Sequence, residues 1–219
     1  LDSLQIHQGE AIAFVGSGGK TSLIAAFAQT LPGPVVITAT THLGAWQTDI
    51  ADHHASVAAP DDINHIEWNT NQTLLITGQP GADDRLKGLN DNEIADLITI
   101  CQDRHITLLI ESDGAKQLNL KAPTDYEPVI PNRVDQVVIV AGLLGLSRPL
   151  TAEFVHRPEV FSRISGIPIG EPVTLEGLAL VLAIPAGGLK GIPQHARTTL
   201  WLNQADTPHL RSLGQGLSR

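Results

Sequence analysis

The stretch that decides the fold is "AIAFVGSGGKTS", which runs from Ala11 to Ser22. It opens with an apolar run typical of a buried strand, and a helical pattern from Thr21 to Leu31 follows the glycines. A glycine-rich turn between a strand and a helix lets backbone N–H groups converge on an anion, and the helix dipole adds to the attraction. The stretch therefore predicts a phosphate-binding loop within an α/β fold.

The chemistry expected of this loop can be assigned residue by residue. The backbone of the turn would hold the phosphates of ATP or GTP, Lys20 would reach the outer phosphates, and the Thr21 hydroxyl would bind Mg²⁺. The nucleotide-binding residues predicted here are Gly16, Ser17, Gly18, Gly19, Lys20, Thr21 and Ser22.

The loop is shorter than the standard phosphate loop. Phe14 stands where the standard pattern has its first glycine, which leaves Gly16-x-x-Gly19-Lys20-Thr21, a form that resembles the loop of the Mur ligases. The alternative is a simple tight turn with Lys20 in solvent at the helix start. That alternative places a cation against the positive end of the helix dipole with no anion to offset it, so we favour nucleotide binding.

Further apolar, β-branched runs indicate strands at 34–40, 73–78, 106–112, 136–142 and 198–203, and helical patterns cover 92–104 and 174–183. This alternation predicts a three-layer, P-loop NTPase-like α/β fold with a mainly parallel sheet. We expect residues 1–219 to form a single nucleotide-binding domain. Residues 47–72 lack clear periodicity and would be an excursion at the sheet edge, and residues 150–195 would form a small helical lobe.

Composition excludes some classes of function. The formal net charge is −9, and no run of Lys and Arg alternates with aromatic residues, so a nucleic-acid partner is not expected. The single cysteine, Cys101, lies in a helical pattern and is expected to be a buried thiol. No apolar stretch approaches the ~20 residues that span a bilayer. We expect a soluble, cytoplasmic protein with no membrane partner.

Polar residues follow several of the predicted strands, where ligands collect in open parallel sheets. Thr40, in "TATTH", would bind Mg²⁺ or contact the terminal phosphate. Glu111 and Asp113, in "LLIESDGAK", resemble the Walker B element, in which a carboxylate holds Mg²⁺ or orients the attacking group. A carboxylate at this place is also a common helix cap, and that alternative stays open.

The last predicted strand ends in "LNQAD". Asn203 and Asp206 resemble the Asn-Lys-x-Asp base-reading motif of GTPases, with Gln in place of Lys, and would bind a guanine base. An Asx-type turn at a strand end explains the same residues, so the choice between ATP and GTP stays open.

Two segments, "LKAPTDYEPVIP" and "FVHRPEVFSRI", are rich in charge and proline. We expect stiff loops that present Lys121, His156 and Arg157 to a ligand, with Arg157 neutralising charge in the transition state. An ordinary polar surface with ion pairs is the alternative.

The segments "VGSGGKTSLI", "ITATTH", "ESDGAKQLNLKAPTDYEPVIP", "VIVAGL", "VHRPEVFSRI" and "GLKGIPQHARTTLWLNQAD" together resemble the YqeC family of selenium-dependent hydroxylase accessory proteins. The resemblance covers nearly the whole chain. It implies a cytoplasmic bacterial protein encoded among genes for selenium-dependent molybdenum hydroxylases, with a phosphate loop and with site residues inside the matching segments. It does not imply a particular reaction.

Three hypotheses follow. The first is an Mg²⁺-dependent nucleoside triphosphatase that assists maturation of a selenium-dependent molybdenum hydroxylase or its cofactor. The second is a Mur-ligase-like ligase or a kinase that acts on a small cofactor precursor. The third is a non-catalytic accessory protein whose bound nucleotide sets its conformation.

Overall fold

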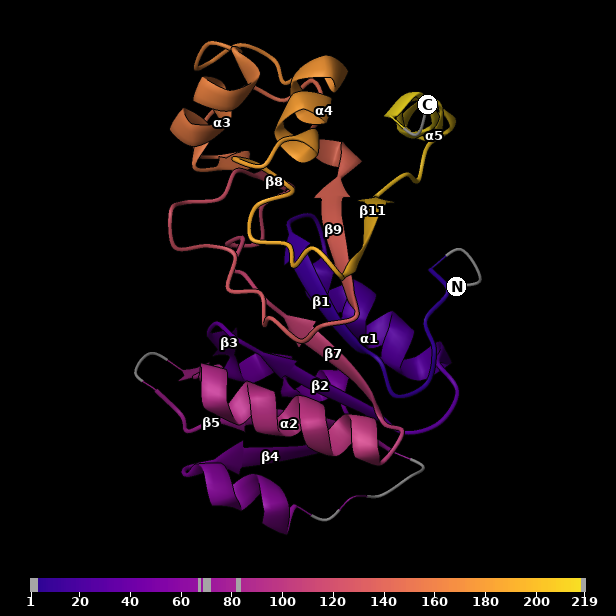
Figure 1. The fold of residues 1–219 in the computed structure, drawn as a ribbon. Coiled ribbons are helices and arrows are strands. Elements are labelled where there is room, and N and C mark those ends of the chain that lie inside the picture. The colour runs from indigo at the N-terminus through magenta and orange to yellow at the C-terminus, as the bar shows by residue number, and fades with distance from the viewer. Residues whose placement is uncertain (1–3, 67, 69–71, 82–83, 218–219) are drawn as a thin grey trace.

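The computed structural model describes residues 4–66, 68, 72–81 and 84–217, and its centre is a sheet of seven strands (Figure 1). The strand order is β11-β9-β1-β7-β2-β5-β4, and every pairing described in this sheet is parallel. The strands are β1 (Ala11–Gly16), β2 (Val35–Ala39), β4 (His53–Val57), β5 (Thr73–Gly78), β7 (Thr107–Glu111), β9 (Gln136–Gly142) and β11 (Arg197–Asn203).

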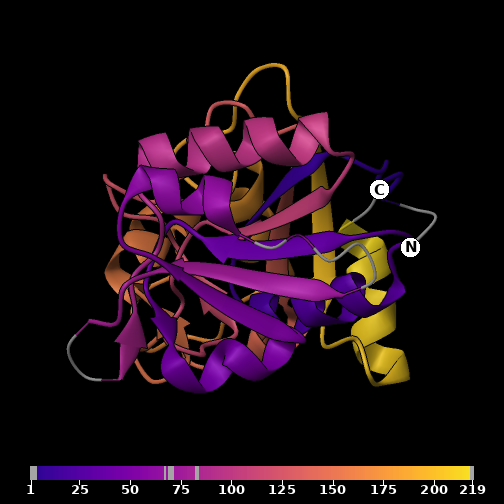
Figure 2. The ribbon, with the colours of Figure 1, turned by 90° about the horizontal axis from the view of Figure 1, so that it is seen from below.

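Helices cover both faces of the sheet. Helix α1 (Lys20–Thr30) lies on one face and α2 (Asp91–Asp103) on the other (Figure 2). Alternate side chains of β1 point to opposite faces of the sheet. Ala11 and Ala13 pack in the cluster under α2, whereas Ile12 and Phe14 pack in the cluster under α1. The apolar runs in the sequence therefore become strands that are buried on both sides.

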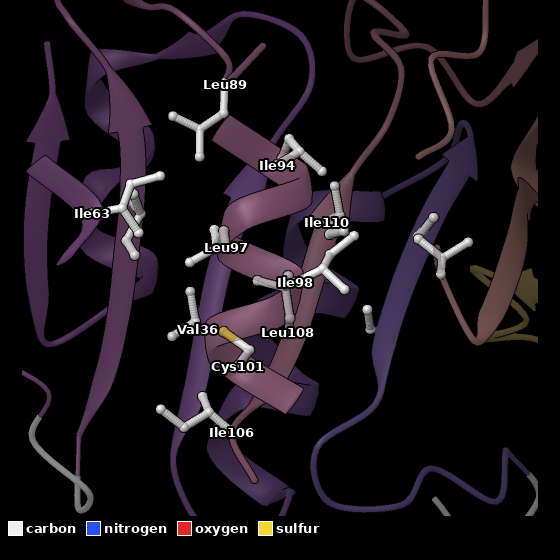
Figure 3. Close-up of a cluster of buried hydrophobic side chains, with 14 of the residues drawn as sticks. Val36, Ile63, Leu89, Ile94, Leu97, Ile98, Cys101, Ile106, Leu108 and Ile110 are labelled. Atoms are coloured by element: carbon white, nitrogen blue, oxygen red, sulfur yellow. The ribbon is translucent and has the colours of Figure 1, made fainter. Parts of the chain in front are cut away.

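The α2 layer shows how densely this core is filled (Figure 3). Ile94, Leu97, Ile98 and Cys101 project from one side of α2 onto the sheet, and all four are buried. Cys101 is 1% exposed, which confirms that it is a core side chain, and this burial raises the pKa of its thiol to about 12.

Six of the seven strands coincide with predicted apolar runs to within a residue at each end. The seventh, β4, lies in the stretch 47–72, for which no strand was predicted. Its residues read "HHASV", and only Val57 is fully buried, because an edge strand pairs on one side only and its outer side chains face solvent. Residues 67 and 69–71 of that stretch lie outside the described residues.

A group of helices lies beyond the carboxyl end of β9 (Figure 1). Helices α3 (Pro158–Ser165) and α4 (Leu175–Ala183) pack together there around Phe161 and Leu178, and α5 (Pro208–Leu217) follows β11. The prediction of a loop across 154–164 was wrong for its second half, because Pro158 occupies the first turn of α3, where a missing N–H costs nothing.

Shorter strands and 3₁₀ helices lie in the connections between the main elements. Strand β3 (Leu43–Gly44) pairs antiparallel with β6 (Arg85–Leu86), and β8 (Leu120–Lys121) pairs parallel with β10 (Val155–His156). Short 3₁₀ helices cover Ala45–Ile50, Pro60–His65 and Leu143–Gly145. Within the part of the chain that the structure describes, no helix is both long and apolar enough to cross a membrane.

Candidate active site

The glycine turn, residues 16–19, connects the carboxyl end of β1 to the first residue of α1. Gly16, Gly18 and Gly19 all have positive φ. A Cβ on Gly18 would lie 2.4 Å from the Cα of Gly142, so the turn packs directly against the end of β9. Only glycine combines this backbone conformation with so close an approach.

Some N–H groups of the turn donate to acceptors in the protein, and others lie at the start of the helix. Ser17 N donates to Val140 O (2.9 Å), and Gly18 N donates to Leu118 O (3.0 Å). The first turn of any helix leaves N–H groups without acceptors inside the helix, and the N-cap Gly19 has no side chain to cap them. An anion at this turn would therefore be held by the start of α1, which includes Thr21 and Ser22.

Lys20 is the first residue of α1 and is buried together with its charge. Its Nζ donates to Gly16 O (2.8 Å) and lies 3.0 Å from Asp113 Oδ1 and 3.7 Å from Glu111 Oε1. Burial alone would lower the pKa of Lys20, but the two carboxylates outweigh burial and raise the pKa above its ordinary value. The lysine is therefore a cation held across the end of the glycine turn.

Glu111 ends β7 and lies on the same face of the sheet as Leu109, which packs in the cluster under α1. Thr21 Oγ1 donates to Glu111 Oε2 (2.8 Å), and Gln47 Nε2 donates to Thr21 Oγ1 (3.0 Å). Burial raises the pKa of Glu111, and the nearby Lys20 offsets only part of this effect. Thr21 and Glu111 thus present two oxygen groups side by side.

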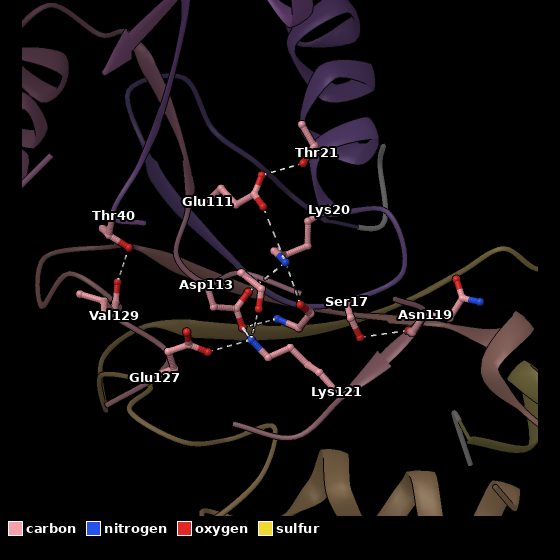
Figure 4. A network of polar contacts seen from close by, with 12 residues as sticks. Ser17, Lys20, Thr21, Thr40, Glu111, Asp113, Asn119, Lys121, Glu127 and Val129 are labelled. Atoms are coloured by element: carbon pink, nitrogen blue, oxygen red, sulfur yellow. Dashed lines mark hydrogen bonds and ion pairs between the residues drawn. The ribbon is translucent and has the colours of Figure 1, made fainter. Parts of the chain in front are cut away.

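Asp113 lies two residues beyond β7 and is 2% exposed (Figure 4). Its Oδ2 accepts from Gly16 N (2.9 Å) and from Lys121 Nζ (2.8 Å). With Lys20 on its other oxygen, one carboxylate connects the glycine turn to two buried lysines. Buried charges need partners of this kind, because desolvation is costly for an unpaired ion.

The ion pairs continue from Lys121 to the helices beyond the sheet. Lys121 Nζ lies 3.2 Å from Glu127 Oε2, and Arg157 Nη1 donates to the same oxygen (2.7 Å). Burial would raise the pKa of Glu127, but Arg157 and Lys121 outweigh it and lower the pKa to about 2. Arg157 is the N-cap of α3 and has a φ of 65°, a strained conformation for a non-glycine residue.

We call the six charged residues Lys20, Glu111, Asp113, Lys121, Glu127 and Arg157 the ion-pair chain. His156 precedes Arg157 at the end of β10 and is half-buried. Burial, assisted by Arg157 and Lys121, lowers the pKa of His156 to about 4, so its ring is neutral at pH 7.

Three predicted residues lie at the margin of this cluster. Thr40 follows β2, and its Oγ1 donates to Val129 O (2.9 Å) rather than to Glu111 or Thr21. Asn203 ends β11, and its Nδ2 donates to Gly18 O (2.8 Å), so it supports the glycine turn. Asp206 is exposed, beyond the end of β11.

Sequence reasoning placed Glu127 in a charged loop that faces a ligand but gave it no role, and it did not point to Gln47. Glu127 joins Lys121 to Arg157, and its place in the charged segment 120–131 was the available signal. Gln47 lies in the aperiodic stretch, and no pattern in the sequence pointed to its contact with Thr21.

Comparison with known proteins gives the chain a family. The model of the family described as YqeC protein matches residues 12–159, which include the glycine turn and the whole ion-pair chain. The chain belongs to the YqeC family. A relative from Escherichia coli strain K12, "Uncharacterized protein YqeC", is 30% identical over 205 residues, which cover 88% of this chain and 75% of the relative.

The YqeC assignment confirms the family resemblance of the sequence motifs. No solved structure matches the chain significantly.

Proposed function

We propose that this protein binds a nucleoside triphosphate with Mg²⁺ at the start of α1 and acts as a P-loop-type nucleoside triphosphatase. In the proposed role it assists maturation of a selenium-dependent molybdenum hydroxylase or its cofactor, as the family resemblance of its motifs implies. ATP and GTP are both candidate nucleotides.

The observation that carries the proposal is the buried position of Lys20 in the first turn of α1, beside the glycine turn. A buried cation at the positive end of a helix is unfavourable unless anions offset it. Glu111 and Asp113 offset it here. Nucleotide phosphates at the helix start would give the same lysine a further anionic partner, which is the role of the lysine in phosphate loops.

The residues present fit an Mg²⁺ ion. Mg²⁺ prefers oxygen ligands and takes only one or two from the protein when phosphates supply others. Thr21 Oγ1 and Glu111 Oε2 lie 2.8 Å apart beside the start of α1, so these two side chains would hold the ion. When bound, the ion would neutralise charge on the terminal phosphates. Asp113 and Lys20 would then orient the groups around the terminal phosphate.

Isothermal titration of ATP and GTP with Mg²⁺ tests the proposal, with Lys20→Met as the main variant and Lys87→Met, which replaces an exposed lysine, as its control. We expect the parent and Lys87→Met to bind one nucleotide equally. Lys20→Met should bind it about 10- to 150-fold more weakly, because a hydrogen bond to a charged group contributes about 1.5–3 kcal/mol.

Further variants keep the test informative if Lys20→Met is unstable. Thr21→Val preserves every charge and should remove the dependence of binding on Mg²⁺, and Asp206→Ala should abolish any preference for GTP. Absence of binding by the folded parent, or equal binding by Lys20→Met, would show the proposal to be wrong.

A second candidate function is phosphoryl transfer to, or ligation of, a small acceptor. The observation that favours it is a second buried lysine, Lys121, which contacts Asp113 Oδ2 while Lys20 contacts Oδ1.

A further inference from the structure

The peptide between Gly18 and Gly19 is the one place in the glycine turn where the backbone leaves its own direction open. Both residues are glycines with positive φ, 83° and 103°, whereas every other peptide of the turn adjoins a residue with a side chain. Glycine adopts φ values of either sign about equally readily. A contact from outside the turn must therefore fix which way this peptide points.

A side chain of β11 makes that contact. Asn203 Nδ2 donates to Gly18 O (2.8 Å), and a Cβ on Gly19 would lie 2.7 Å from the same nitrogen. The amide thus lies against both residues of the peptide. Because the peptide is planar and trans, its N–H points away from its carbonyl oxygen. By holding the Gly18 carbonyl, Asn203 turns the Gly19 N–H in the opposite direction.

The N–H of Gly19 is available to a ligand. Gly19 is half-buried, and its N–H has no acceptor in the part of the chain that the structure describes. Gly19 is also the N-cap of α1, so this N–H adjoins those of the first helical turn, which have no acceptors inside the helix. An anion at the start of α1 gains one more donor if the Gly19 N–H points toward it.

Asn203 is itself held in place beside the turn. The next residue, Gln204, donates from Nε2 to Asn119 Oδ1 (3.0 Å). The backbone oxygen of Asn119 accepts in turn from Ser17 Oγ (3.0 Å), inside the glycine turn. Two links therefore join the end of β11 to the turn, and the link from Asn203 is the one that acts on the peptide between the two glycines.

We propose that Asn203 is a positioning residue for the phosphate chain of the ligand and not a reader of its base. It holds the Gly18–Gly19 peptide so that the Gly19 N–H donates to a phosphate oxygen at the start of α1. This role rests on the proposed function, because it requires phosphates at that place. It requires no base, so a polyphosphate without a base should show it as clearly as a nucleotide does.

Inorganic triphosphate is the probe that separates the two roles, because it has phosphates but no sugar or base. Isothermal titration with Mg²⁺ compares triphosphate, ATP and GTP on the parent and on Asn203→Leu, which keeps the approximate size of the side chain but has no donor. The control is Thr198→Ala, at an exposed residue of the same strand. Asn203→Leu should bind every probe that the parent binds about 2- to 10-fold more weakly, by the same factor, as for the net contribution of one hydrogen bond.

The outcomes separate this role from the proposed function. Weaker binding of ATP or GTP with unchanged binding of triphosphate would assign Asn203 to the base and overturn the role, as would unchanged binding of every probe. The proposed nucleotide site stands in both cases. A parent that binds neither nucleotide nor triphosphate would overturn the proposed function and this role together.

NMR on ¹⁵N-labelled protein distinguishes a turned peptide from a general loss of structure. In ligand-free Asn203→Leu, the amide signal of Gly19 should broaden or split, because two orientations of the peptide are populated. Triphosphate should return this signal to its position in the parent complex. A Gly19 signal in the ligand-free variant identical to that of the parent would overturn the proposal. Asn203→Ala carries the same measurements if Asn203→Leu does not fold.

Discussion

Replacing Lys121 by Met tests whether the ion-pair chain stabilises the fold at the carboxyl edge of the sheet. The Lys121 side chain is 3% exposed, and its Nζ contacts Asp113 Oδ2 (2.8 Å), Gly114 O (2.6 Å) and Glu127 Oε2 (3.2 Å). Met preserves much of the apolar stem but removes all three contacts. Asp113 then loses one of its two lysine partners while staying buried.

The expected loss of stability follows from these contacts. Removing one partner of a buried ion pair costs about 3–5 kcal/mol, because the remaining charge is left uncompensated. Asp113 retains Lys20 at 3.0 Å and the N–H of Gly16, so the lower end applies and we expect about 3 kcal/mol. At about 2–4 °C per kcal/mol for a chain of this size, the melting temperature should fall by about 6–12 °C.

The assay is thermal unfolding followed by circular dichroism, with urea unfolding as a second measure. Arg197→Met is the matched control, because it breaks an ion pair of 2.7 Å with Glu10 in which the arginine side chain is 43% exposed. Exposed pairs contribute about 1 kcal/mol at most, so this variant should lose no more than about 2–4 °C.

A double variant examines the coupling directly. Lys121→Met combined with Asp113→Asn should be less destabilised than the sum of the two single variants, because the neutral amide no longer needs the lysine. The reasoning is refuted if Lys121→Met loses no more than Arg197→Met, or if the two single losses simply add.

Two further predictions concern the ring of His156 and the backbone of Gly18. The pKa of His156 in the folded protein, about 4, lies below the ordinary 6.5, so the stability from its neutral ring is complete above pH 6.5 and is lost as the pH falls to 4. Between pH 6.5 and pH 4, the free energy of unfolding in urea should fall by about 1–2 kcal/mol more for the parent and for the control His209→Gln than for His156→Gln. This figure allows for the partial exposure of the ring. Equal losses in all three proteins would contradict the prediction. Gly18→Ala should lower the melting temperature clearly more than Gly166→Ala. Both glycines have positive φ, but only a Cβ at Gly18 would meet Gly142, at 2.4 Å. Equal losses of melting temperature would refute the close packing.

The fold was predictable where burial on both faces left a plain signal. Runs such as "ITLLIES" are mostly apolar up to their carboxyl end, because a central parallel strand has no solvent face, and they became strands almost residue for residue. Strand β4 gave no such signal, since its two histidines are exposed polar residues in a strand at the edge of the sheet. Helix α3 was missed because Pro158 was interpreted as stiffening a loop rather than as starting a helix.

The candidate site was predictable to the extent that it follows from strand ends. Because parallel strands all finish at one edge, Lys20, Glu111 and Asp113 had to lie near one another, and they do. The order of the ion-pair chain could not be predicted in the same way. It depends on the path of residues 122–131, which brings Glu127 between Lys121 and Arg157, and no periodic pattern encodes that path.

The hydrogen bond from Asn203 to Gly18 joins residues 185 positions apart. A ribosome that has synthesised the chain only as far as residue 196 has already made the glycine turn, Glu111 and Asp113, but not β11. The Gly18 carbonyl then has no amide from Asn203, and β9 has one open edge. A nascent chain at that point carries an unfinished site, so the proposed nucleotide site would be completed only late in translation, when β11 joins the sheet.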